Sequence, residues 1–152
     1  MNFHFFRFMA SKNYHLSTII DGNRVFKAAN VRNIHSVILA LTEGLSKIDS
    51  LRYIKIYNDR ICASNQLSDD RKKEPITKTG QDGIIGVQLL VDPDHRTIQF
   101  YSLTSSKKGN GRRIVASVVQ ATPDDWMLAV PMDWSGGFWA RMVDEFPRIA
   151  VL

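Results

Sequence analysis

The sequence predicts one α/β domain, of the α+β type, with a mixed and mainly antiparallel sheet flanked by helices. Apolar residues alternate with polar ones along several short segments, as is typical of half-buried strands. Other segments carry apolar residues at helical spacing. The chain has 152 residues, of which 44% are hydrophobic and 23% charged. This is enough for one domain over residues 1–152 to bury a core without a metal or a disulfide.

The first half predicts a hairpin, a helix and a strand. Asp21, Gly22 and Asn23 form a turn signal between strands at 14–20 and 24–28, because these residue types tolerate a positive φ. Apolar residues then recur at helical spacing over 34–48, behind Asn33 as the N-cap. Residues 52–58 alternate as in a strand, and the apolar N-terminal segment 1–10 is also predicted as a strand.

A polar segment interrupts the pattern at residues 65–83. It has mixed charge and is punctuated by Pro75, Gly80 and Gly83. Such a composition predicts a long mobile loop.

The second half predicts a regular alternation of elements. Strands at 84–91 and 97–103 are separated by a Pro-Asp turn, so we expect them to pair antiparallel. A helix follows from Arg112 and ends near Pro123, which cannot continue it. A short strand at 127–132, a helix at 138–146 and a final strand at 148–152 complete the predicted domain.

Charge and cysteine usage limit the class of protein. The formal net charge is +5 and the pI is about 9.5, which favours an anionic partner such as a nucleotide cofactor, RNA or DNA. The single cysteine, Cys62, cannot form an internal disulfide. Together with the lack of an apolar segment that would span a membrane, this predicts a cytoplasmic protein without a membrane partner.

The segment SSKKGNGRRIVASVV, residues 105–119, is the strongest candidate for a binding site. It leads from a predicted strand into a predicted helix through Gly109 and Gly111. Backbone N–H groups at a helix N-terminus point the same way and carry partial positive charge, so they suit a phosphate. Without a Cβ, the two glycines would let a pyrophosphate approach the main chain. The segment matches neither a Walker loop nor the three-glycine dinucleotide motif.

The order of elements around this turn resembles the GNAT superfamily of acyl-coenzyme A N-acyltransferases over roughly residues 84–152. The family turn reads Gln/Arg-x-x-Gly-x-Gly/Ala, and here Ser106 stands at the first place, ahead of Gly109 and Gly111. The resemblance implies a GNAT-like sheet, with coenzyme A pyrophosphate on the turn amides and pantetheine beside the preceding strand. The cofactor-binding residues it implies are Tyr101, Ser102, Leu103, Ser106, Lys107, Lys108, Gly109, Asn110, Gly111, Arg112, Phe138 and Trp139.

The resemblance also implies acyl transfer from acetyl-CoA to an amine by direct attack on the thioester. Many family members protonate the departing thiolate with a tyrosine early in the last helix, but here Trp139 stands at that place after Phe138. Indole is not a useful acid. The candidates for this role are therefore Tyr101, Tyr57, His95 or water. The expected partners are acetyl-CoA and an amine of a small molecule, a protein or an RNA; no metal is expected, and a homodimer is compatible with the sequence.

Two other functions stay open. A non-catalytic protein would use the basic turn and the Arg71–Lys73 stretch on nucleic acid phosphates. A GNAT-like fold would bind coenzyme A without turnover.

The simplest interpretation of residues 68–74 is a solvated loop. The three tryptophans, Trp126, Trp134 and Trp139, are predicted to pack rather than to stack on bases.

Overall fold

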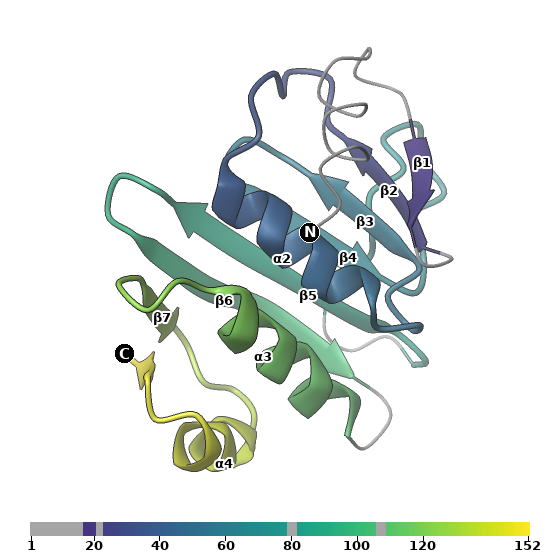
Figure 1. Cartoon of the computed structure of the whole chain (residues 1–152). Coiled ribbons are helices and arrows are strands. Elements are labelled where there is room, and N and C mark those ends of the chain that lie inside the picture. The colour runs from purple at the N-terminus through teal and green to yellow at the C-terminus, as the bar shows by residue number, and fades with distance from the viewer. Residues whose placement is uncertain (1–16, 21–22, 79–81, 106–108) are drawn as a thin grey trace.

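The computed structural model describes residues 17–20, 23–78, 82–105 and 109–152. Within these ranges eight strands form one sheet whose spatial order follows the chain (Figure 1). Four neighbouring pairs are antiparallel, and β2–β3, β6–β7 and β7–β8 are parallel. The mixed α+β class predicted from the sequence is confirmed. The strands are β1 (Ser17–Ile20), β2 (Asn23–Lys27), β3 (Tyr53–Ile56), β4 (Arg60–Ser64), β5 (Ile85–Asp92), β6 (Thr97–Ser105), β7 (Met127–Val130) and β8 (Ile149–Val151).

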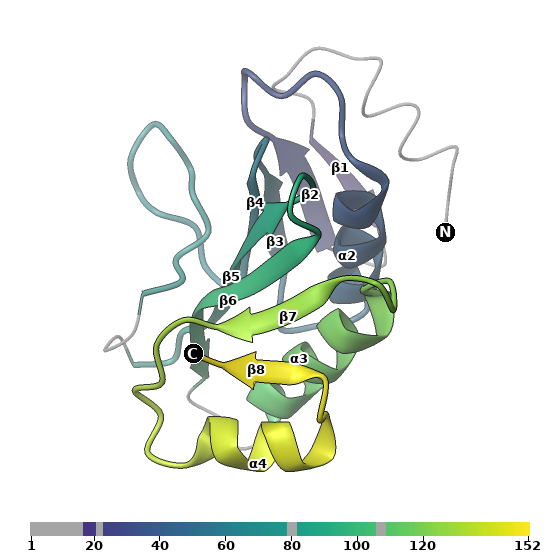
Figure 2. The ribbon, with the colours of Figure 1, turned by 90° about the vertical axis from the view of Figure 1, so that its left-hand side faces the viewer.

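Each parallel pair is joined through a helix, because parallel neighbours need a crossover connection. The helices are α2 (Ser36–Ser46) before β3, α3 (Asn110–Ala121) before β7 and α4 (Phe138–Glu145) before β8. Helices α2 and α3 pack on each other over one face of the sheet. Figure 2 shows the connection between β4 and β5 projecting from the other face.

The core lies between α2, α3 and the sheet. Helix α2 buries Ile38, Leu41 and Leu45, while β3 alternates so that Ile54 and Ile56 are fully buried. Each fully buried side chain of this size stabilises the fold by roughly 1.5–3 kcal/mol. The helical and alternating spacings of the sequence predicted these two elements, and both are confirmed.

Helix α2 begins two residues later than the N-cap prediction. His35 is the N-cap, and its Nδ1 accepts the N–H of Val37 at 3.1 Å. The assignment of Asn33 as the cap is therefore wrong. The His35 ring also packs against Trp126, with 5.7 Å between ring centroids, so tertiary packing fixes where the helix starts.

The predicted hairpin of β1 and β2 is confirmed, but Asn23 belongs to the strand and not to the turn. Asn23 is 2% exposed, and its Nδ2 donates to the carbonyls of Ser46 at 2.7 Å and Ile48 at 3.3 Å. The side chain thus ties the start of β2 to the C-terminal end of α2. The other turn residues, 21 and 22, lie outside the described residues, as does the strand predicted at 1–10.

Strand β4 was missed by the sequence prediction. Residues 61–64 are all buried, so they show no alternation of apolar and polar residues. The strand pairs antiparallel with β3 on one side and β5 on the other, and both of its faces are covered. Cys62 lies in it, and burial raises the pKa of its thiol to about 11. A thiol of this kind stays protonated at neutral pH.

The connection from residue 65 to 78 contains a β-bridge and local hydrogen bonds that the sequence did not predict, while its predicted mobility stays a prediction. Leu67 and Pro75 form a β-bridge, and the Ile76 N–H donates to the Gln66 carbonyl at 2.9 Å. At its tip, Asp70 Oδ1 accepts the Ser68 hydroxyl at 2.8 Å and two backbone N–H groups. Local polar bonds of this kind replace the apolar contacts that a pattern search detects. We call residues 65–78 the folded loop.

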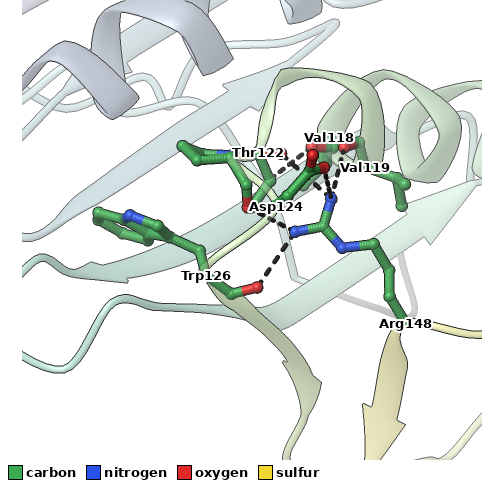
Figure 3. Close-up of polar contacts among 7 residues, drawn as sticks. Val118, Val119, Thr122, Asp124, Trp126 and Arg148 are labelled. Atoms are coloured by element: carbon green, nitrogen blue, oxygen red, sulfur yellow. Dashed lines mark hydrogen bonds and ion pairs between the residues drawn. The ribbon is translucent and has the colours of Figure 1, made fainter.

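Arg148 holds the C-terminal end of α3 to the beginning of β8 (Figure 3). Its guanidinium, on a side chain that is 29% exposed, donates to four backbone carbonyls. Cations are favoured at helix C-termini, where carbonyls have no helical partner. The acceptors are the carbonyl oxygens of Val119, Thr122, Pro123 and Trp126, at 2.6 to 3.4 Å.

In the described part of the chain, no helix has the length and apolar character needed to cross a membrane.

Candidate functional site

Strand β6 parts from β7 after the first third of its length. The two strands pair only through residues 97–99 of β6, from Thr97↔Met127 to Gln99↔Ala129. Beyond this point β6 continues to Ser105 in register with β5 on its other side. No strand of the described chain pairs with the second edge of residues 100–105. We call this stretch the open edge.

A bulge at Tyr101 accompanies the separation. Leu89 pairs with Phe100 and Gln88 pairs with Ser102, so Tyr101 is one residue extra in β6. A bulge bends the strand that carries it and increases its twist, which turns β6 away from β7. The Tyr101 side chain is 58% exposed, whereas Ser102 and Leu103 are half-buried. The Ser102 hydroxyl donates to the carbonyl of Thr77 in the folded loop at 2.5 Å.

Helix α3 starts at the end of the open edge. Gly109 is its N-cap, with a φ of 93° that only glycine adopts easily, and no side chain caps the first turn. A Cβ added to Gly109 would meet nothing within 4 Å, so this backbone is accessible. The N–H groups of Asn110, Gly111 and Arg112 in the first turn have no helical acceptor. The predicted residues Ser106, Lys107 and Lys108 lie outside the described residues.

Gly111 has a different role from the one predicted. A Cβ at this position would lie 3.0 and 3.1 Å from two ring atoms of Phe138, and the residue is buried. The missing side chain therefore makes room for α4, not for a phosphate. The expectation that Gly111 opens the main chain to a pyrophosphate through its lack of a Cβ is wrong, and Gly109 is the accessible glycine.

The first two residues of α4 join the open edge to α3. Phe138 packs on Gly111 and lies 5.1 Å, edge to face, from Trp139. The Trp139 ring, on a residue that is 6% exposed, lies 4.9 Å from the ring of Phe100. The structure thus brings together three predicted segments from β6, α3 and α4. Phe100, which packs on Trp139 just before the bulge, was not predicted as a site residue.

The guanidinium of Arg112 is engaged by a carboxylate of α4. Its Nε donates to both oxygens of Glu145 at 2.8 and 2.9 Å, and its Nη2 makes a third bond to the same group. These hydrogen bonds lower the pKa of Glu145 and raise that of Arg112. The backbone N–H of Arg112 faces the start of the helix, but its side chain ties α3 to α4. The pair of Arg112 and Glu145 was not predicted, because the two residues are 33 positions apart in the chain.

The candidate acids lie in three different places. Tyr101 is on the open edge. Tyr57 follows β3, three strands away from β6 or about 14 Å at ordinary strand spacing. Burial, and to a smaller degree nearby Cys62 and Glu74, raise the pKa of Tyr57, which makes it a weaker proton donor. His95 lies in the turn before β6, at the end opposite to α3 and about 27 Å along the strand from Ser105.

His95 has a local partner in its turn. Its Nδ1 lies 2.7 Å from Oδ2 of Asp92, and the His95 side chain is 79% exposed. The hydrogen bond from His95 is the largest cause of a lowered Asp92 pKa. Among the three candidates, only Tyr101 therefore lies on the open edge.

Two clefts lie elsewhere on the molecule. One, of ≈ 480 Å³, runs between α2 and α3 and is lined on one side by Glu43 and Lys47 and on the other by Arg113 and Gln120. The second, of ≈ 530 Å³, lies between β2, β3 and the folded loop. Neither cleft includes the open edge. The sequence indicated the Arg71–Lys73 stretch of the second cleft as a possible phosphate contact. It did not indicate Arg24 or Lys55, because only the pairing of β2 and β3 brings these two residues beside that stretch.

No protein-family model, curated protein or solved structure matches the chain.

Proposed function

We propose that the chain binds an acyl-coenzyme A between the open edge and the N-terminus of α3, and that it transfers the acyl group to an amine. The observation that carries the proposal is the separation of β6 from β7 at the Tyr101 bulge, directly before a helix that starts at an accessible glycine. An unpaired strand edge offers N–H and C=O groups to the two amides of pantetheine. The uncapped first turn offers N–H groups to the pyrophosphate.

The chemistry needs no covalent intermediate on the protein. A neutral amine attacks the thioester carbonyl, a C–N bond forms, and the C–S bond breaks to release coenzyme A thiolate. A strand N–H at the open edge would hold the carbonyl oxygen as it gains negative charge. The amine loses a proton to water or a carboxylate, and the thiolate takes one. Tyr101 is the proton donor we favour, since it is exposed on the edge while Tyr57 and His95 lie far from it.

A second candidate, coenzyme A binding without turnover, rests on Trp139. Its indole is buried against Phe100 and cannot protonate a thiolate. This candidate shares the binding step and differs only in chemistry. Release of free thiol from acetyl-CoA in the presence of an amine panel separates the two.

Acetyl-CoA is expected to raise the melting temperature of the protein. A ligand at one hundred times its Kd stabilises the native state by about 2.7 kcal/mol. For a domain of this size that corresponds to roughly 5–10 °C. Differential scanning calorimetry over a range of acetyl-CoA concentrations measures the shift. A melting temperature that stays constant up to millimolar acetyl-CoA would contradict the proposed site.

Two variants distinguish a site formed by backbone N–H groups from a site formed by charged side chains. Gly109→Val forces a β-branched residue into a positive φ, with strain of about 1–3 kcal/mol that moves the first turn. We expect acetyl-CoA affinity to fall about tenfold or more, with α3 helicity retained in circular dichroism. Lys107→Ala with Lys108→Ala removes two charges but no backbone N–H group, and should weaken binding by about tenfold at most. A nucleic acid site would give the reverse ranking, because lysines then make the contacts.

A further inference from the structure

A second binding site is formed by the cleft between β2, β3 and the folded loop. Its volume is ≈ 530 Å³, which is within the usual range for small-molecule sites. Six of its ten lining residues are basic and none is acidic. We call it the basic cleft. Its lining residues are Arg24, Phe26, Lys27, Ala28, Ala29, Lys55, Leu67, Arg71, Lys72 and Lys73.

The folded loop is fixed over the sheet with its cations beside those of the strands. Phe26 of β2 is directly opposite Lys55 of β3 in the sheet register. Lys55 Nζ donates to the carbonyl of Lys72 at 3.0 Å and lies 5.7 Å from the centre of the Phe26 ring. A strand lysine thus attaches the basic tip of the loop to the sheet, so the cleft has two basic walls and a partly apolar floor.

Two acidic residues near the tip of the loop, Asp70 and Glu74, have partners outside the cleft. Asp70 accepts the Ser68 hydroxyl and the N–H groups of Lys72 and Lys73. These bonds, of which the one from Ser68 is the largest cause, lower the Asp70 pKa because they favour the ionised carboxylate that accepts them. Glu74 is hydrogen bonded to Tyr57 outside the cleft. Asp70 and Glu74 are therefore engaged outside the cleft, and no carboxylate is among the residues that line it.

Four of the six basic side chains of the cleft lack ion-pair partners in the ranges that the structure describes. Arg24, Arg71, Lys72 and Lys73 form no salt bridge with any described carboxylate. Like charges gathered around one concavity repel one another, and a multivalent anion relieves that repulsion. A concave site enclosed by a loop favours a compact anion over a nucleic acid strand, which needs contacts spread along a track.

We infer that the basic cleft binds a chain of linked phosphates, as found in inorganic polyphosphate or in a nucleoside triphosphate. Guanidinium and ammonium groups on two walls suit phosphate oxygens that diverge from one chain. The site is separate from the open edge, because β3 and β6 are three strands apart, or about 14 Å. The inference does not depend on the acyl-coenzyme A proposal.

Calorimetric titration with inorganic tripolyphosphate tests the inference on the full chain. Wild type should bind saturably, with one tripolyphosphate per protein. Arg71→Gln with Lys73→Gln removes two exposed cleft charges and should weaken binding by about tenfold or more. Arg32→Gln with Arg52→Gln removes two exposed charges that do not line the cleft, and should change the affinity by less than about twofold. Equal losses in both double variants, or no binding to wild type, would overturn the inference.

Further arms identify the source of the phosphates and separate the two sites. Equal affinities for tripolyphosphate and ATP would assign binding to the phosphate chain. Tighter ATP binding would indicate an additional contact to the nucleoside. Either result supports the basic cleft as the binding site. Binding of an oligo-dT strand without binding of tripolyphosphate would overturn it. Tripolyphosphate should bind equally well to protein saturated with acetyl-CoA. Competition between tripolyphosphate and acetyl-CoA would also overturn the inference. A protein that binds tripolyphosphate but not acetyl-CoA would contradict only the acyl-coenzyme A proposal.

Discussion

Trp139→Ala is expected to lower the free energy of unfolding by about 3–5 kcal/mol, the usual cost of removing a large buried aromatic side chain. The indole is 6% exposed and contacts the rings of both Phe100 and Phe138. Its loss would leave a cavity between β6 and α4 at the place where the open edge begins. Urea denaturation followed by circular dichroism measures the change.

Trp134→Ala is the matched control for that experiment. Trp134 is 84% exposed, against the prediction that all three tryptophans pack, so its removal should change stability by no more than about 0.5 kcal/mol. A similar loss for Trp134→Ala and Trp139→Ala would contradict the packing described for α4.

Arg148→Met is expected to lower the free energy of unfolding by about 2–3 kcal/mol, because it leaves carbonyls at the end of α3 without their charged donor. Methionine keeps much of the side-chain length, so the lost hydrogen bonds dominate over lost packing. Arg148→Lys keeps the charge but cannot reach four carbonyls in one plane, and its loss should fall between wild type and Arg148→Met.

Arg141→Met provides the comparison for a surface arginine. Arg141 is exposed on α4 and makes no salt bridge with a described carboxylate. The substitution should change the unfolding free energy by less than about 0.5 kcal/mol. If Arg148→Met were as mild in the same urea titration, the four carbonyl contacts would carry no net stability.

The parts of the fold that were predicted correctly are those in which burial follows a simple period. Helix α2 and strand β3 each bury one face, and their apolar spacing gave their type and approximate extent. Strand β4 is buried on both faces and showed no period to detect. His35 was not recognised as a cap, because histidine is not among the residue types that usually cap a helix N-terminus.

In the candidate site, too, some features could be predicted from the sequence and others could not. The glycine turn between a strand and a helix was visible in the sequence, since it depends on neighbours along the chain. The role of Gly111 was not, because it depends on Phe138, which is distant in sequence and reaches it only through the packing of α4 on α3. The basic cleft likewise needs β2, β3 and the folded loop to be brought together by strand pairing. Local chemistry was predictable, and long-range contacts were not.

The strictly sequential strand order has a consequence for how the molecule folds. Each strand pairs with the strands that come just before and just after it in the chain. Strands β3 to β6 form a continuous meander, so a nucleus can assemble there with only modest loop-closure entropy. The other described strands then add outward at either edge, and none of them has to insert between two that have already paired. We therefore expect β7, α4 and β8 to be ordered last during folding and to unfold first in local opening of the native state. Helix α4 packs on the start of the open edge through Trp139 and Phe100.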